Sequence, residues 1–214
     1  MRQYEVQDKY FQLAKAQGYR ARSAFKLLDI QSKYHLIRPG EVIVDLGSAP
    51  GSFLQVIEAI VGQTGRVFGI DLQEMEPFRF PHVKTMVGDI FEKEAFLDAL
   101  RDLGIHKVDG VTSDLAPKTS GIRDLDAGRS AELTEQAFYL STLVLKPGGF
   151  FVGKVFEGSE FQKLLKRVKS RFKEVHVFKP PSCRERSFET YIVAQRFLAV
   201  PRPIASFQKS PKKS

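Results

Sequence analysis

The chain lacks most of the features that mark secreted, membrane-spanning or metal-binding proteins. It contains one cysteine, Cys183, so neither an intramolecular disulfide nor a cysteine-based zinc site is possible, and we expect this thiol to be inert. No apolar run approaches the roughly 20 residues that cross a bilayer. The N-terminal MRQYEVQDKY has no apolar segment typical of a signal peptide. We therefore expect a cytoplasmic monomer that uses neither a membrane nor a metal ion.

The sequence also lacks internal repeats, and its length predicts one domain. Its 214 residues are 43% hydrophobic, which suits a single domain with a sizeable core. We place this domain at residues 1–200, with residues 1–38 as a basic N-terminal helical extension. The only low-complexity piece is PRPIASFQKSPKKS, residues 201–214, whose proline, serine and lysine content predicts a disordered basic tail.

Positive charge is concentrated at the two ends of the chain. The net charge is +8, but residues 1–40 carry +5, residues 41–153 carry −7 and residues 154–214 carry +10. A basic surface attracts polyanions by Coulomb forces and by the release of their counterions. A merely solvated surface would explain the charge equally well, and an anionic membrane fits less well because the basic segments lack an apolar aromatic face. Charge alone therefore leaves a nucleic-acid partner as one of two open interpretations.

Short apolar runs alternate with helical patterns through most of the chain. The expected buried strands are residues 42–47, 66–72, 83–89, 110–114 and 150–156, and the expected helices between them are residues 52–61, 95–103 and 130–145. Near-continuous apolar runs are typical of parallel strands covered on both faces, so this alternation predicts an α/β doubly wound sheet. Residues 8–17 and 23–34 are expected to form two earlier helices, the second capped by Ser23.

The last two expected strands follow a different rule. Residues 174–178 and 189–197 have strand patterns, and the link 179–188 between them contains two prolines and is too short for a crossover helix. Strands joined without such a helix pair antiparallel. We therefore expect a parallel sheet that ends in an antiparallel hairpin.

Three expected strands end in residues suited to an adenosine-containing ligand. DLGSAPGSF, residues 45–53, follows the first strand, where ligands bind in open α/β sheets, and its glycines permit close backbone approach. Asp71 ends the second strand and could accept both ribose hydroxyls, while Asp89 ends the third and could accept an adenine amine. For the first motif alone, a plain strand-to-helix turn is the alternative. Ala49 and Pro50 break the GxGxxG spacing, which argues against a nicotinamide-dependent oxidoreductase.

Lys154 is unusual because it lies in the apolar run FFVGKVF. Burying an unpaired ammonium is costly. Lys154 is therefore either paired with a carboxylate for structural reasons or has a chemical role with a shifted pKa. Asp114 is the last residue of the fourth expected strand.

Together, these motifs resemble the FtsJ/RrmJ-type ribose 2′-O-methyltransferases, and most closely the bacterial members that act on a uridine of 23S ribosomal RNA. The resemblance runs from about Asp8 to Phe197 and rests on DKYFQLAKAQGYRARSAFKL, DLGSAPGSF, GIDLQEM, VGDI, SDLAPKTSG, LKPGGFFVGKVFEG and KPPSCRERSFETYIV. It implies a Rossmann-like class I S-adenosylmethionine methyltransferase fold. That fold has a mostly parallel seven-stranded sheet, an antiparallel terminal hairpin and helices on both faces.

The resemblance also implies which residues form the site. The family's catalytic tetrad falls on Lys26, Asp114, Lys154 and Glu189. The implied S-adenosylmethionine contacts are Gly47, Ser48, Ala49, Pro50, Gly51, Phe53, Asp71, Leu72, Asp89, Ile90 and Asp114. Position 53 is usually Trp in the family, so Phe53 keeps a π-face but loses a donor, and Ser52 stands where relatives often have Gly. An acidic–basic segment of the family corresponds to Asp124, Asp126 and Arg129, with slightly different spacing.

The implied reaction needs a proton acceptor. A sulfonium already makes the methyl group electrophilic, so the protein must align the reacting groups and remove a proton from a weakly acidic alcohol. Lys154 is the implied base, although an unperturbed lysine is neutral in only roughly 1 molecule in 2,500 at pH 7. We expect burial and the charge of Lys26 to lower its pKa, while Asp114 chiefly orients it and Glu189 positions Lys26 or the ribose.

The basic ends are expected to bind RNA. Basic residues of the N-terminal segment are Lys9, Lys15, Arg20, Arg22 and Lys33. The expected phosphate contacts are Arg20, Arg22, Arg184 and Arg186, which adjoin tetrad members in the sequence; such contacts position RNA without reading its bases. The implied partner is 23S ribosomal RNA or the large ribosomal subunit. A tRNA substrate, a small-molecule methyltransferase and a non-catalytic RNA-binding module remain alternatives.

Overall fold

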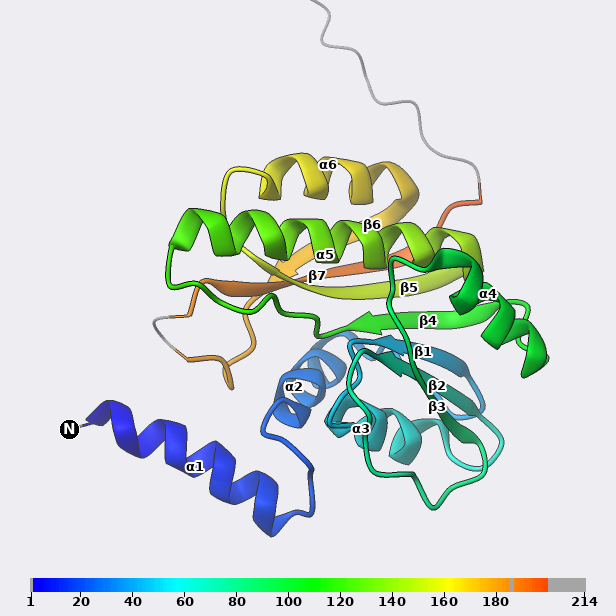
Figure 1. Ribbon diagram of the computed structural model, residues 1–214, viewed down its shortest axis with the longest axis horizontal. Helices are drawn as coiled ribbons and strands as arrows, with labels where there is room; N and C mark the ends of the chain where they lie inside the picture. Colours follow the sequence, from blue (N-terminus) through cyan, green and yellow to red (C-terminus); the bar gives the residue numbers. More distant parts are fainter. Residues whose placement is uncertain (1, 185–186, 200–214) are drawn as a thin grey trace, which may run out of the picture.

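A seven-stranded sheet forms the centre of the molecule (Figure 1). The computed structural model describes residues 2–184 and 187–199, so the tail at residues 201–214 lies outside the described residues. The strands are β1 (Val42–Leu46), β2 (Arg66–Asp71), β3 (Val83–Val87), β4 (Val108–Ser113), β5 (Leu145–Phe156), β6 (Phe172–Phe178) and β7 (Glu189–Phe197). The helices are α1 (Arg2–Ala16), α2 (Ala24–Tyr34), α3 (Ser52–Val61), α4 (Lys93–Asp102), α5 (Arg123–Val144) and α6 (Phe161–Arg171).

The strands follow the order β3-β2-β1-β4-β5-β7-β6. β1 to β5 pair in parallel, whereas β7 pairs antiparallel with both β5 and β6. The predicted α/β fold, with a mostly parallel sheet and an antiparallel end, is confirmed. β2 and β3 lie on one side of β1, whereas β4 and the later strands lie on its other side. The strand order therefore switches between β1 and β4, and ligands bind at such switch points in open α/β sheets.

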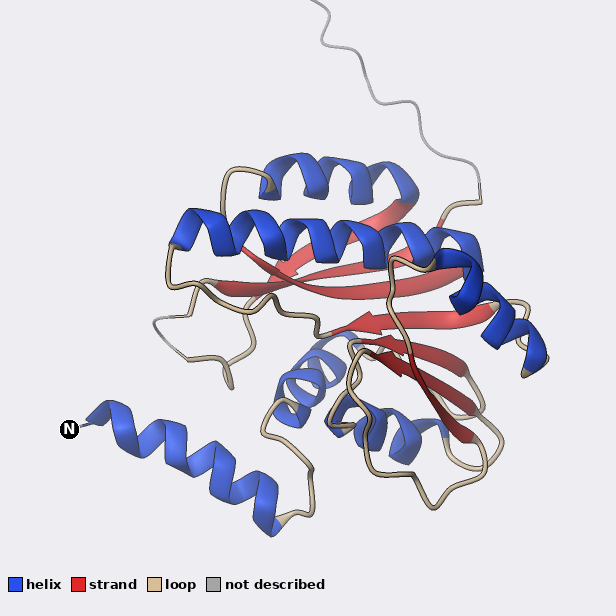
Figure 2. Cartoon of the chain, viewed as in Figure 1, coloured by secondary structure: helices blue, strands red, loops and turns tan. Residues whose placement is uncertain are grey.

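Helices cover both faces of the sheet (Figure 2). α2 and α3 pack on one face, where a first apolar core includes Leu27, Leu54 and Val152. α4, α5 and α6 pack on the other, where a second core includes Phe96 and Phe151. Because both faces are filled with apolar side chains, polar side chains gather at the carboxyl ends of the strands.

α1 lies apart from the sheet and reaches outward beyond α2 (Figure 1). Near its C-terminal end Ala14 is buried, and the rings of Tyr10 and Phe25 lie 5.5 Å apart. Phe11 on the same helix is 61% exposed. Over residues 9–16, α1 therefore contacts the rest of the fold through a few apolar side chains and leaves others, such as Phe11, exposed.

Several elements differ from the sequence prediction. β3 was expected to be buried, but it is an edge strand in which only Val83 is buried and Val87 is exposed. α5 begins at Arg123 rather than at residue 130. α6 was not predicted, although its buried residues Phe161, Leu164, Leu165 and Val168 have helical spacing.

Ser23 is the N-cap residue of α2, as expected, but its side chain makes no capping hydrogen bond. Its hydroxyl instead lies 2.7 Å from the Ser52 hydroxyl at the start of α3. This contact between residues far apart in the sequence ties the two helices of the same face together.

The insertion of β7 between β5 and β6 positions the site. In the β5–β7 register, Lys154 lies opposite Tyr191 and Phe156 lies opposite Glu189. Residues opposite one another in an antiparallel pair, and residues two apart on one strand, point to the same face. Lys154, Tyr191 and Glu189 therefore project on the face that α2 covers.

Candidate active site

Lys154 and Asp114 form a buried ion pair where β4 and β5 end. The Lys154 ammonium lies 3.0 Å from Asp114 Oδ1 and donates to the Asp114 backbone oxygen at 2.6 Å. Lys154 is 5% exposed. Two acceptors from one residue thus hold the ammonium in place, which offsets part of the cost of burying it.

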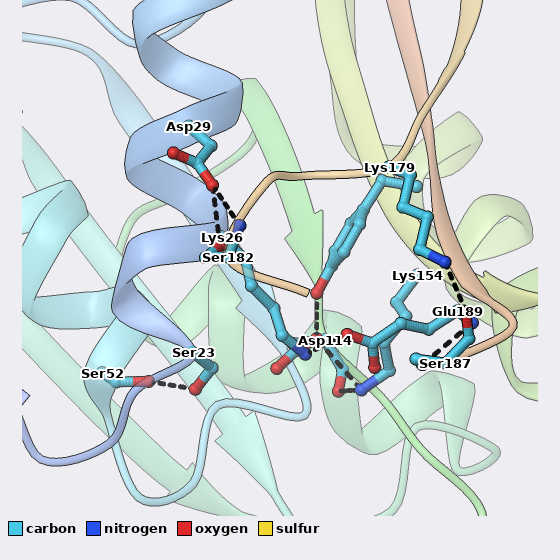
Figure 3. A network of polar contacts seen from close by, with 11 residues as sticks. Ser23, Lys26, Asp29, Ser52, Asp114, Lys154, Lys179, Ser182, Ser187 and Glu189 are labelled. Carbon is cyan, nitrogen blue, oxygen red and sulfur yellow. Dashed lines mark hydrogen bonds and ion pairs between the residues drawn. The ribbon is translucent and has the colours of Figure 1, made fainter. Parts of the chain in front are cut away.

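Lys26 and Glu189 form a second buried pair beside the first. The Lys26 ammonium lies 2.8 Å from Glu189 Oε1, and both side chains are largely buried. Figure 3 shows the side chains of Lys26, Asp114, Lys154 and Glu189 converging from α2, the end of β4, β5 and β7. The structure therefore brings together all four members of the predicted tetrad.

Tyr191 is part of this cluster, and the sequence analysis missed it. Its hydroxyl donates to Asp114 Oδ1 at 2.5 Å, and its ring is fully buried. The Lys26 ammonium lies 6.0 Å from the ring centroid. The available signal was the spacing of Glu189 and Tyr191, since residues two apart on a strand share a face.

Electrostatic coupling favours the charged forms of Asp114, Glu189 and Lys26. Burial raises the pKa of Asp114, but the ammoniums of Lys154 and Lys26 outweigh burial and the net pKa is lowered. Burial also raises the pKa of Glu189, and Lys26 again reverses this effect. Burial lowers the pKa of Lys26, but Asp114 and Glu189 hold it above its ordinary value. At neutral pH the site therefore holds a fixed cation at Lys26 and two carboxylates.

Cys183 lies against the second pair. Burial, together with the hydrogen bond and the charge of Glu189, raises the pKa of the Cys183 thiol to about 12. The thiol is therefore protonated at neutral pH and donates to Glu189, whose pKa this hydrogen bond helps to lower. A buried, protonated thiol is a poor nucleophile.

The loop between β1 and α3 has the backbone shape that its glycines predict. Gly47 and Gly51 have φ angles of +76° and +104°, in the left-handed region that favours glycine. A Cβ at Gly47 would lie 2.6 Å from the Leu115 side chain. The loop therefore packs closely against the segment that follows Asp114.

Three buried oxygens at these strand ends suit a polar ligand. Asp45 Oδ2, Ser48 Oγ and Ser113 Oγ are buried without a hydrogen-bond partner among the described residues. Buried polar atoms are normally paired. Burial raises the pKa of Asp45 well above its usual range, although a hydrogen bond from Thr112 opposes this. Unpaired hydroxyl and carboxyl oxygens beside a glycine loop fit the amino, carboxyl and hydroxyl groups that S-adenosylmethionine carries.

Asp71 and Asp89 stand where the sequence analysis expected them, and each bonds to nearby backbone. Asp71 Oδ2 accepts from the Ala49 amide at 3.0 Å, and its Oδ1 accepts from the Gln73 amide at 2.8 Å. Asp89 Oδ1 accepts from the Phe91 amide at 2.9 Å. A carboxylate has about four acceptor positions, so both residues keep capacity for a ligand.

The apolar residues among the expected cofactor contacts differ in how much of their side chain is exposed. Leu72 is 69% exposed beside Asp71, where it could cover a base. Phe53 is 2% exposed and packs in the core with residues of α2 and α3, so its ring offers little accessible surface, and its contact with the cofactor stays a prediction. Ile90 is likewise buried, in the opposite core, so only its backbone remains as a possible contact.

Arg20 has partners that the sequence analysis did not foresee. Its guanidinium donates to the backbone oxygens of Pro50, Glu76 and Pro77 at 2.8–3.2 Å. It also lies over the Phe78 ring, 4.1 Å from the centroid. Most of its donors are therefore occupied by the protein itself, which leaves few of them for a phosphate, and the phosphate contact stays a prediction. Arg20 joins the segment between α1 and α2 to the glycine loop.

The other expected phosphate contacts are placed differently. Arg22 is half-buried, and its side chain has no hydrogen-bond or ion-pair partner in the described part of the chain. Arg184 is exposed on the link between β6 and β7, and Arg186 lies outside the described residues.

Asp126, from the acidic–basic segment, accepts from both Ser120 and Gly121, and these hydrogen bonds lower its pKa. It shapes the loop that leads from Asp114 into α5.

Over residues 2–184 and 187–199, no group of three histidine, cysteine or acidic side chains is arranged to hold a metal ion. Within the same ranges, every helix is too short or too polar to cross a membrane.

Comparisons with known proteins point to one family. A family model described as FtsJ-like methyltransferase matches residues 19–197. A ribosomal RNA large subunit methyltransferase E from Anaeromyxobacter sp. (strain Fw109-5) is 44% identical over 192 residues, covering 90% of this chain and 69% of the relative. A protein of the same name from Syntrophobacter fumaroxidans is 44% identical over 196 residues, covering 90% of this chain and 97% of the relative.

Solved structures agree with the fold. A crystal structure of a Plasmodium falciparum protein described as a ribosomal RNA methyltransferase has a TM-score of 0.73 and 30% identity. The match covers 84% of this chain and 99% of that one. An S-adenosylmethionine-dependent O-methyltransferase from Thermotoga maritima has a TM-score of 0.53 at 18% identity, covering 81% of this chain and 64% of that one, which supports the fold alone.

Proposed function

This chain belongs to the FtsJ-like methyltransferase family, and we propose that it methylates a ribose 2′-hydroxyl of large-subunit ribosomal RNA with S-adenosylmethionine as donor. The observation that carries the proposal is the convergence of Lys26, Asp114, Lys154 and Glu189 at one edge of the sheet. The substrate follows from relatives over 40% identical that are named large-subunit ribosomal RNA methyltransferases. The expected nucleotide is a uridine of 23S ribosomal RNA, which such an enzyme would meet in the cytoplasm.

The donor would lie along the carboxyl ends of β1, β2 and β3. The glycine loop at residues 47–51, Asp71 with Leu72, and Asp89 with Ile90 are the residues that would hold it. When bound, the donor supplies a methyl group that is attached to a positively charged sulfur. That sulfur is the leaving group when a hydroxyl oxygen attacks the methyl carbon. Asp114 ends the neighbouring strand, so its carboxylate is placed between this binding region and Lys154.

Lys154 is the proposed acceptor of the hydroxyl proton. Asp114 fixes its Nζ through two contacts, which limits the directions in which the nitrogen can meet a ribose oxygen. A proton leaving the 2′-hydroxyl would move to Lys154 Nζ as the oxygen attacks, provided that this nitrogen is neutral when RNA binds. Alignment of the reacting atoms supplies a large share of the acceleration in such transfers.

Lys26 and Glu189 have a supporting electrostatic role in this proposal. Lys26 remains an ammonium because its pKa is raised, so its charge stabilises negative charge that develops on the 2′-oxygen. Glu189 holds Lys26 at 2.8 Å and can accept from a ribose hydroxyl with its second oxygen. Lys26 and Glu189 thus position the sugar, while Lys154, oriented by Asp114, accepts the proton.

The test is mass mapping of 2′-O-methyl groups after incubation of purified protein with S-adenosylmethionine. Undermethylated large ribosomal subunits, free 23S RNA and bulk tRNA serve as parallel substrates, and the Lys154→Ala variant is the control. We expect methylation of a uridine in large-subunit RNA and at least a 100-fold lower rate in the variant. Methylation of tRNA alone would overturn the substrate, and near-normal turnover by Lys154→Ala would remove Lys154 as the base.

A further inference from the structure

A cleft adjoins the tetrad on the side away from the proposed donor site. It has a volume of about 470 Å³ and is lined by Arg123, Glu157, Lys179, Ser187, Phe188 and Glu189. These residues come from the start of α5, the end of β5 and the link that leads into β7. Glu189 belongs to both the cleft and the tetrad, so a ligand that fills the cleft lies next to the reacting ribose.

Phe188 is the aromatic wall of this cleft, and it is held firmly. Its ring packs against Phe156 with centroids 4.7 Å apart, in an edge-to-face arrangement. Its backbone oxygen accepts from the Glu157 amide at 3.0 Å. Phe188 is only half-buried, so part of the ring remains accessible. A ring fixed from behind and open in front can stack with a planar partner.

Two cationic side chains line the cleft with the ring. The Arg123 guanidinium is exposed at the start of α5 and lies over the face of the Phe188 ring, 5.5 Å from its centroid, so a base that stacks on this face would take its place and leave the guanidinium to pair with the phosphate. The Lys179 ammonium donates to the Ser187 backbone oxygen at 2.6 Å, which braces the link just before Phe188 (Figure 3). An aromatic ring together with a mobile, exposed guanidinium is the combination that binds a base and its phosphate in single-stranded nucleic acids.

We propose that this cleft binds the nucleotide that adjoins the methylated ribose, with its base stacked on Phe188 and its phosphate held by Arg123. This inference rests on the proposed function, because the ligand is defined by its place beside the target sugar. Stacking accepts any base, so the cleft orients the strand rather than reading its sequence.

The first experiment uses the absence of tryptophan from the chain. Phe188→Trp introduces one fluorophore into the cleft, and a base stacked on it quenches its emission. The probes are the uridine trinucleotide UpUpU and two trinucleotides with an abasic site at the 5′ or the 3′ position. We expect quenching by UpUpU, and a loss of quenching with at least about tenfold weaker binding for one of the abasic probes.

Tyr139→Trp provides the matched control. Tyr139 is 44% exposed on α5, sixteen residues after Arg123, which places it roughly 24 Å along the helix from the cleft. Its emission should not respond to any of the three trinucleotides. Equal quenching of Phe188→Trp by all three probes, or no quenching by UpUpU, would overturn the inference.

Kinetics test the same cleft without a fluorophore. Phe188→Leu keeps apolar packing against Phe156 but removes the π-face, and Phe188→Tyr keeps both. We expect Phe188→Leu to raise the KM for RNA about tenfold with little change in kcat or in the KM for S-adenosylmethionine, while Phe188→Tyr stays near wild type. A fall in kcat at unchanged KM for RNA would contradict the assignment.

The two proposals fail in different ways. If the proposed function is wrong, wild-type protein transfers no methyl group to a ribose 2′-hydroxyl of large-subunit RNA, whatever the fluorescence shows. If only the cleft assignment is wrong, wild-type protein methylates RNA, but binding and quenching do not depend on the neighbouring base. Arg123→Gln adds an independent measurement, because it should weaken UpUpU binding severalfold and leave the affinity of uridine, which has no phosphate, unchanged.

Discussion

At the scale of single residues, the contact between Tyr191 and Asp114 offers a direct test of how the first ion pair is held. The Tyr191 hydroxyl donates to Asp114 Oδ1 at 2.5 Å inside the buried cluster. Tyr191→Phe removes this donor and preserves the ring. Hydrogen bonds to charged groups contribute about 1.5–3 kcal/mol, so we expect kcat for methyl transfer to fall about tenfold or more.

The matched control for this change is Tyr34→Phe. The Tyr34 ring contacts His176 and Phe178, away from the tetrad. Urea unfolding of both variants separates a loss of activity from a loss of fold. A Tyr191→Phe enzyme with the kcat of wild type would show that Asp114 keeps its position without this bond.

The Lys26–Glu189 pair predicts how stability depends on pH. Glu189 has a lowered pKa, so its contribution to stability is present above its unfolded-state pKa of about 4.3 and is lost as the pH falls below that value. Lys26 has a raised pKa, so its contribution is present below about pH 10.4 and is lost as the pH rises through the folded-state value. Between these limits the contribution of the pair should be constant.

The measurement compares the free energy of urea unfolding of wild type and of the Lys26→Met/Glu189→Gln variant from pH 4 to pH 11. The difference in free energy of unfolding should be constant from about pH 5 to 10. Outside this range, the stability of wild type relative to the variant should fall. The exposed pair of Lys163 and Glu160 is the control, because solvent screens such pairs and their removal should leave little pH dependence. A difference that changes steadily across neutral pH would refute the assigned charges.

At the scale of elements, the segment between α1 and α2 is attached to the glycine loop through Arg20. A Cβ at Gly51 would lie 2.7 Å from the Arg20 guanidinium, and the Gln55 side chain bonds to the backbone of both Arg20 and Gly18. The link is therefore packed against the start of α3. The basic extension at residues 1–38, which was expected to bind RNA, thus also supports the proposed donor site.

The corresponding prediction contrasts two neighbouring arginines. Arg20→Ala removes three hydrogen bonds to the loops at Pro50 and at residues 76–77, so it should weaken binding of S-adenosylhomocysteine about tenfold in calorimetry without RNA. Arg22→Ala removes a side chain without a partner in the described part of the chain and should leave that affinity unchanged. If Arg20→Ala reduces only the affinity for RNA, the original assignment of Arg20 to phosphate is right.

At the scale of the whole molecule, the uneven charge predicts salt-sensitive RNA binding. The basic ends flank an acidic middle, and each phosphate that a protein neutralises releases counterions. With about four phosphate contacts, the KM for RNA should rise at least about tenfold between 50 and 200 mM KCl. The affinity for S-adenosylhomocysteine, measured in the same buffers, is the control and should change little. A KM for RNA that is insensitive to salt would contradict the electrostatic interpretation.

The sequence by itself determined the alternation of strands and helices, the places of the motifs and the distribution of charge. These properties are local, because hydrophobic periodicity and turn residues act over a few neighbouring positions. The antiparallel end was predictable for the same reason, since the short link at residues 179–188 excludes a crossover helix. The tetrad could be named from resemblance, but its geometry could not be worked out from spacing.

Only the tertiary structure decided which distant residues meet. Tyr191 reaches Asp114 because β7 inserts between β5 and β6, and Arg20 is occupied because the loop at residues 76–77 folds back onto it. Ser23 is the N-cap residue of α2, but its hydroxyl bonds to Ser52 and not to the amides of that helix. β3 is exposed because it lies at the edge of the sheet. Strand order and the packing of loops depend on the whole set of buried contacts, which no local pattern in the chain encodes.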